Sequence, residues 1–142
     1  MRKAAYLFTL LWVAGFSTAL MAWSQNSAGA DSPHVVEVVA KTFEFTPSEI
    51  HVKMGERVQI KLRTADRAHG LKLNIYPEGA SEDGNPGLIF EHPQDDAKVE
   101  KNKDRVIEFT ATRAGTYDFN CSVRCSMGHG HDRMTGKLIV DE

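Results

Sequence analysis

Arg57-Val-Gln-Ile-Lys-Leu-Arg63 alternates polar and apolar side chains with a period of two. This period is typical of a β-strand that has one face on a core and the other in water. Similar stretches lie on both sides of it, and Gly or Pro residues separate them as turns. Residues 71–76, 105–110 and 116–121 alternate in the same way, whereas residues 35–40 and 50–52 are β-branched runs and residues 137–140 close the chain. Seven or eight short strands at this spacing predict an all-β, antiparallel sandwich.

One segment of the chain does not follow this pattern. Residues 78–94 are rich in Gly, Pro and acidic side chains. We expect this insertion to hold a short helix or no regular structure.

The N-terminal thirty residues differ in composition from the rest. Arg2 and Lys3 are followed by an uncharged stretch, which is almost wholly apolar or small over residues 4–23. This pattern predicts a secretory signal, with Ala28-Gly-Ala30 or Ala22 as the cleavage site. The apolar run is also long enough to span a bilayer, so an uncleaved membrane anchor is the alternative.

Either alternative places the folded part outside the cytoplasm, exported to the periplasm or anchored to the outer face of the inner membrane. We therefore divide the chain into residues 1–30, a signal peptide or anchor, and residues 31–142, one domain with one core. Without Arg2 and Lys3 the chain carries 15 basic and 19 acidic residues. This mildly acidic balance gives no indication of nucleic-acid binding.

The densest group of metal-binding side chains lies near the C-terminus. It consists of Cys121, Cys125, His129, His131 and Met134. Thiolate, thioether and imidazole together form a donor set that favours copper over zinc, calcium or magnesium.

Two simpler interpretations compete with copper. Two cysteines in an exported protein commonly form a disulfide, and two Cys with two His can hold zinc. Neither accounts for the Met beside the loop or for His69, which stands at the head of a predicted strand some fifty residues upstream. A sandwich can bring such a histidine to the loop between its last two strands.

With these motifs the chain resembles the cupredoxins, and most closely the dinuclear copper A domain of cytochrome c oxidase subunit II and of nitrous oxide reductase. Asp66-Arg-Ala-His69-Gly-Leu71 matches the early histidine element of that family. Cys121, Cys125 and His129 match its loop, and the segment from Met134 to Val140 resembles its Met and closing strand. The resemblance implies a cupredoxin-like Greek-key sandwich.

The resemblance also implies a ligand set. Cys121 and Cys125 would bridge two copper ions, and His69 and His129 would each bind one of them. Met134 and the backbone carbonyl of Val123 would complete the site.

The second loop histidine departs from the family pattern. The family places its Met three positions after its His, whereas Met134 is five positions after His129 and three after His131. We prefer His129 because it keeps the family's spacing from Cys125. His131 is the alternative ligand.

The leading hypothesis is an exported electron carrier with a dinuclear copper site, freestanding or serving a membrane oxidase. Its expected partner is a redox protein such as a c-type cytochrome or that oxidase. Nothing in the motif supplies an open position or a general base, so we do not expect an enzyme. A mononuclear cupredoxin and a copper-handling protein are the alternatives.

The charge of the acidic insertion concerns how a redox partner could bind. Residues 73–97 contain six acidic residues and no Lys or Arg. This segment is either a solvated loop or a docking face for a basic redox partner, because complementary charge steers encounter.

Overall fold

A computed structural model describes residues 32–82, 84–94, 98–123 and 134–142, which belong to one compact unit, Asp31–Glu142. The expected leader, residues 1–30, lies outside the described residues, and its boundary stays a prediction. Cys125, His129 and His131 also lie outside them. Within the described ranges, no helix has the length and apolar character needed to cross a membrane.

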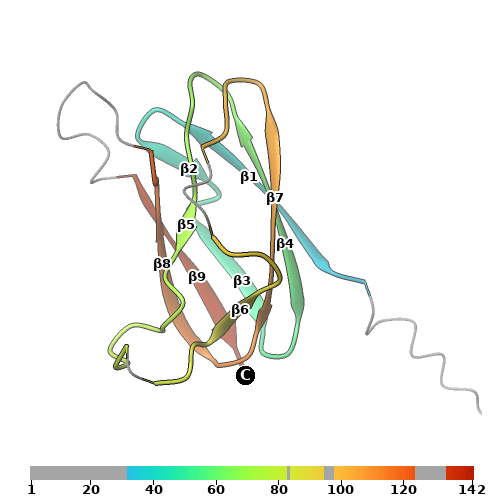
Figure 1. The fold of residues 1–142 in the computed structure, drawn as a ribbon, viewed down its shortest axis with the longest axis vertical. Coiled ribbons are helices and arrows are strands. Elements are labelled where there is room, and N and C mark those ends of the chain that lie inside the picture. Colours follow the sequence, from blue (N-terminus) through green and yellow to red (C-terminus); the bar gives the residue numbers. More distant parts are fainter. Residues whose placement is uncertain (1–31, 83, 95–97, 124–133) are drawn as a thin grey trace, which may run out of the picture. The chain divides into compact units, whose positions relative to one another are not determined.

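The described residues form strands that assemble into two facing sheets, as Figure 1 shows. One sheet has the order β2-β1-β4-β7-β6 and the other the order β3-β9-β8-β5. The strands are β1 (His34–Lys41), β2 (Glu44–Thr46), β3 (Glu49–Lys53), β4 (Arg57–Thr64), β5 (Lys72–Leu73), β6 (Leu88–Phe90), β7 (Asp104–Ala111), β8 (Gly115–Asn120) and β9 (Thr135–Asp141). The predicted all-β sandwich is confirmed.

The pairing of the strands is mixed rather than purely antiparallel. β1 pairs with β4 in parallel, and so does β3 with β9, whereas the other pairings are antiparallel. The chain crosses between the sheets after β2, so β4 returns to the first sheet in the direction of β1. Alternation in the sequence identifies the buried face of a strand but not its partner, and it therefore missed these two pairs.

The alternating residues build the core between the sheets. Val58, Ile60 and Leu62 of β4 are fully buried, as their period predicts. Phe45 and Phe119 meet edge to face across the two layers, with ring centroids 5.3 Å apart. Tyr117 is also buried, and its hydroxyl donates to the carbonyl of Arg113 at 2.6 Å.

The insertion at residues 78–94 contains a strand where we expected a short helix or no regular structure. β6 pairs antiparallel with β7, and Phe90 packs against Phe109 at a centroid distance of 5.4 Å. β6 and β5 are the last strands of their sheets.

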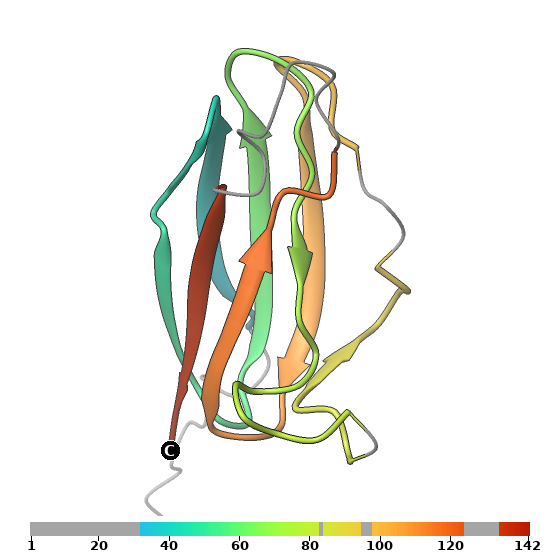
Figure 2. The ribbon, with the colours of Figure 1, turned by 90° about the vertical axis from the view of Figure 1, so that its left-hand side faces the viewer.

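The register places several strand ends at one end of the sandwich, the upper end in Figure 2. β4 and β8 finish there, and β7 and β9 begin there. The segments that carry His69, Cys121 and Met134 lie just beyond these strand ends. We call this region the site end.

Candidate metal centre

His69 is held inside the site end by its own backbone. Its side chain is fully buried. Its amide donates to the carbonyl of Val99 at 3.1 Å, and the amide of Val99 donates back to the carbonyl of His69 at 2.7 Å. This isolated bridge fixes the backbone position from which the imidazole projects.

The carboxylate of Asp66 holds the imidazole from one side. Its Oδ1 lies 2.8 Å from Nε2 of His69 and accepts the amide of Arg67 at 2.8 Å. Its Oδ2 accepts both the amide and the hydroxyl of Thr42. Burial of the carboxyl raises the pKa of Asp66, but the hydrogen bonds from Thr42, His69 and Arg67 outweigh burial and hold that pKa well below its usual range.

This contact decides the tautomer of His69. An ionised carboxylate can only accept hydrogen bonds, so Nε2 of His69 carries the proton. Nδ1 is then the ring nitrogen that can offer a lone pair to a metal, and it lies 3.9 Å from the sulfur of Cys121. The imidazole is therefore oriented with its metal-binding nitrogen toward the thiol.

Cys121 and Met134 lie side by side at the open ends of β8 and β9. The amide of Cys121 donates to the carbonyl of Met134 at 3.1 Å. Among the described residues Cys121 is a free thiol, and its sulfur lies 3.8 Å from the carbonyl oxygen of Val123. The side chain of Met134 is fully buried.

Four of the sequence-predicted site residues thus meet at the site end: His69, Cys121, Val123 and Met134. Within the described ranges, no group of three His, Cys, Asp or Glu side chains is close enough to hold a metal. Cys125, His129 and His131, the residues that would extend the donor set, lie outside those ranges. Their role as ligands stays a prediction.

Sequence reasoning missed two residues of the site, Thr42 and Val99. Val99 acts through its backbone, for which no side-chain pattern exists. Thr42 lies 24 positions from Asp66, in the turn between β1 and β2. The resemblance to the family includes Asp66 in the early histidine element, but its contacts with Thr42 and Arg67 could not be read from the sequence.

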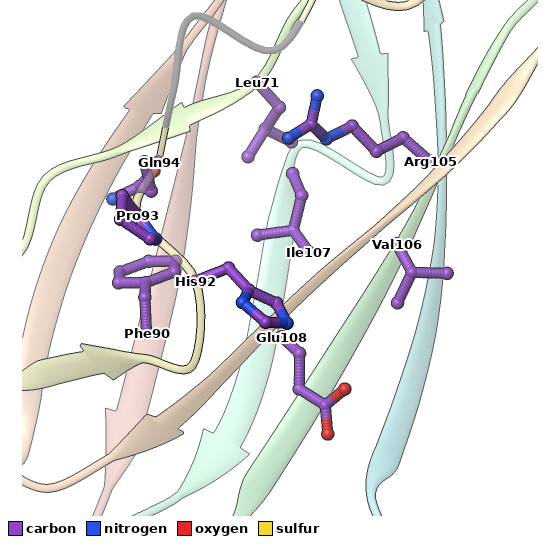
Figure 3. Close-up of a pocket in the computed structure, with 9 residues that line it drawn as sticks. All are labelled: Leu71, Phe90, His92, Pro93, Gln94, Arg105, Val106, Ile107 and Glu108. Atoms are coloured by element: carbon purple, nitrogen blue, oxygen red, sulfur yellow. The ribbon is translucent and has the colours of Figure 1, made fainter.

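A separate pocket of about 340 Å³ lies beside Leu71, two positions after His69 (Figure 3). Phe90, Ile107 and the half-buried Arg105 line it, and Arg105 shares the inward-facing register of Ile107 on β7. His92 also lines the pocket. No residue that lines this pocket carries sulfur, so its donor set does not suit copper.

The acidic insertion is partly neutralised by basic residues from elsewhere in the fold. Glu78 pairs with Lys137 at 2.5 Å, and Glu91 lies 4.0 Å from Arg57. Each of these cations also contacts a second carboxylate, since Lys137 lies 3.3 Å from Asp118 and Arg57 lies 2.7 Å from Glu108. The solvated loop and the docking face therefore both stay predictions.

Comparison with known proteins agrees with this architecture. A family model described as a cupredoxin-like domain matches residues 11–140. No curated protein matches the chain significantly.

Solved structures share the fold. Auracyanin A, described as a "blue" copper protein of Chloroflexus aurantiacus, is 22% identical with a TM-score of 0.56, over 78% of this chain and 100% of its own. Auracyanin B is 18% identical with a TM-score of 0.57, over 79% of this chain and 92% of its own. A chain of a heme-copper terminal oxidase dimer is 20% identical with a TM-score of 0.53, over 82% of this chain and 68% of its own. At these identities the likeness is one of fold.

Proposed function

The chain belongs to the cupredoxin-like domain family, and from this premise we propose that it is an exported copper protein that carries electrons. The metal would lie at the site end. The observation that carries the proposal is the distance of 3.9 Å between Nδ1 of His69 and Sγ of Cys121, two residues 52 positions apart in the chain.

The residues at the site end fit copper. A buried imidazole with its lone pair toward a thiol, and a Met beside that thiol in the backbone ladder, form a mixed nitrogen and sulfur donor set. His69, Cys121 and Met134 would hold the metal together with Cys125, His129 or His131, and the carbonyl of Val123. Copper bound there supplies a reversible one-electron couple.

The scaffold supports electron transfer rather than substrate chemistry. Asp66 fixes the ring of His69, Val99 fixes its backbone, and the β8–β9 ladder fixes Cys121 against Met134. Ligands held in this way need to move little when an electron is gained or lost. We therefore propose a carrier and not an enzyme, with a redox protein such as a c-type cytochrome or a membrane oxidase as its partner.

We favour a dinuclear site because Cys121 and Cys125 keep the spacing of the copper A loop. The test is to load the metal-free domain with copper and to record its stoichiometry and its electron paramagnetic resonance spectrum. A dinuclear site gives two copper ions per chain and hyperfine splitting from two nuclei. One ion per chain with splitting from a single nucleus would establish the mononuclear alternative.

Single replacements of the two cysteines sharpen this test. In a dinuclear site, Cys121→Ser and Cys125→Ser should each abolish the two-copper spectrum, because both thiolates would be needed to hold the two ions. In a mononuclear site one of the two replacements leaves colour and stoichiometry intact. His34→Gln, at an exposed position near the start of β1, is the matched control and should change neither.

Export is the remaining part of the proposal. The leader would direct the domain to the periplasm, where it would be released or stay anchored through residues 4–23. Fractionation of cells that express the full chain distinguishes these outcomes. Recovery of the domain in the cytoplasm would contradict both.

A further inference from the structure

The turn between β1 and β2 is connected to the candidate metal centre by Thr42. Its amide donates to Oδ2 of Asp66 at 2.8 Å, and its hydroxyl donates to the same oxygen. Both bonds join segments that lie 24 positions apart. Thr42 contacts the carboxylate on the oxygen that does not face His69.

The other side of the same carboxylate faces the ligand. Oδ1 accepts from Nε2 of His69 and from the amide of Arg67, each at 2.8 Å. The side chain of Arg67 lies farther away, with Nε 3.9 Å from Oδ2. The carboxylate of Asp66 is therefore shared between the Thr42 side and the His69 side.

We propose that Thr42 is a positioning residue that weakens Asp66 as the hydrogen-bond acceptor of His69. Thr42 thereby raises the reduction potential of the metal. The proposal rests on the proposed function. Each hydrogen bond donated to a carboxylate withdraws negative charge from it, so fewer donors make it a stronger acceptor. A stronger acceptor at Nε2 makes Nδ1 a better electron donor, and a better donor stabilises the more oxidised metal.

Thr42 lies in a tight turn whose next residue has an unusual backbone conformation. Phe43, the residue after Thr42, has a φ of 64°, which is rare for a bulky side chain. Its side chain is 54% exposed, so core packing does not account for this conformation. Lys41 pairs with Glu44, so Thr42 and Phe43 form a two-residue loop whose second residue takes a positive φ, and the two bonds from Thr42 attach this loop to Asp66.

The experiment compares Thr42→Val, Thr42→Ser and Asp66→Asn. In the metal-free full domain, the readout is the NMR signal of the Nε2 proton of His69. Thr42→Val should move this signal downfield and slow its exchange with water, because the remaining bond to Asp66 strengthens. Thr42→Ser keeps the hydroxyl and should restore the wild-type signal.

In the copper-loaded domain, the readout is the reduction potential. Thr42→Val should lower the reduction potential, and Thr42→Ser should restore the wild-type value. Asp66→Asn should raise the potential, because a neutral amide is a weaker hydrogen-bond acceptor for the imidazole than a carboxylate. Thr112→Val is the matched control: its hydroxyl bonds to the carbonyl of Gly87 at the opposite end of β7, and it should change neither readout.

The outcomes separate this inference from the proposed function. If the wild-type domain binds no copper, the proposed function fails, while the NMR comparison still tests the link from Thr42 to His69. An unchanged Nε2 proton signal in Thr42→Val would overturn the inference. So would a potential that stays constant or rises in that variant, or a serine that fails to restore it.

Discussion

Gly136 lies directly against the ring of Phe119, its partner across the β8–β9 ladder. A Cβ at position 136 would stand 2.2 Å from Cζ of Phe119 and 2.6 Å from the carbonyl oxygen of Ser48. Phe119 is itself locked against Phe45 in the core. The ring therefore has no room to yield, and the position requires glycine.

Gly136→Ala should consequently destabilise the domain. Inserting a methyl group into a packed core costs about 1–3 kcal/mol, and the clash here is with backbone as well as with an aromatic ring. Urea unfolding measures the change. Gly84→Ala is the comparison: its Cβ would stand 3.3 Å from the carbonyl oxygen of Ser81, a contact that a small local shift relieves, so it should cost less than Gly136→Ala. Equal stabilities of the two variants would contradict this packing argument.

Gln94 closes the end of the strand ladder at β5. Its side-chain carbonyl accepts the amide of Leu73 at 2.8 Å, and its side-chain amide donates to the carbonyl of Leu73 at 3.0 Å. Gln94→Ala leaves both backbone groups without these partners, at a cost of about 1–2 kcal/mol.

Thermal or urea unfolding checks the Gln94 prediction. Gln59→Ala provides the comparison, because Gln59 makes one side-chain bond, to Glu108 at 3.2 Å, and should cost less. If Gln94→Ala were as stable as wild type, the pairing with Leu73 would contribute nothing.

How far the fold could be predicted depends on the length of each strand. Arg57–Thr64 was predicted almost to the residue, because an eight-residue strand with one buried face carries a clear period. Leu88–Phe90 is too short to show one. The stretch 71–76 alternates over six residues, yet the strand there is only Lys72–Leu73. Gln94, a residue from the insertion, takes the place of a neighbouring strand at Leu73, and local sequence does not reveal such a contact.

Some residues of the candidate site could likewise be predicted from the sequence, and others could not. His69 and Cys121 could be placed together because their residue types and flanking strands identify them. Asp66 belongs to the motif that resembles the family, but its hydrogen bond to His69 became visible only in the structure. Thr42 and Val99 support these residues through contacts that are distant in the sequence and involve backbone atoms. Such contacts follow from the assembled fold and not from any spacing of side chains.

His51 should make stability depend on pH. It lies between Glu49 at 3.1 Å and Asp141 at 3.4 Å, on the parallel pair β3–β9. Hydrogen bonds to Glu49 and then to Asp141 raise the pKa of His51 above its usual 6.5. Because the folded pKa exceeds the unfolded one, this contribution is fully present below about pH 6.5 and is lost as the pH rises through the folded pKa.

The measurement is the free energy of unfolding of wild type minus that of His51→Gln, across this pH range. The difference should be larger at about pH 5.5 than at about pH 8, and added salt should reduce it, since the groups are exposed. A difference that grows with pH would reverse the assigned sign.

Phe43 offers a test of backbone strain in the turn that carries Thr42. At a φ of 64°, a β-branched side chain is strongly disfavoured, whereas Asn tolerates this region. Asn already occupies the other described non-glycine position of this kind, Asn102, at a φ of 58°. Phe43→Asn should therefore be more stable than Phe43→Val by about 1–2 kcal/mol, although Val is the more hydrophobic residue.

Val106 supplies the matched control for this comparison. It is 52% exposed, close to the 54% of Phe43, but it lies within strand β7. Extended backbone favours Val over Asn, so Val106→Asn should be less stable than wild type. The order of the two residues should thus be opposite at positions 43 and 106. The same order at both positions would mean that side-chain hydrophobicity, and not the left-handed backbone, determines the stability of the turn.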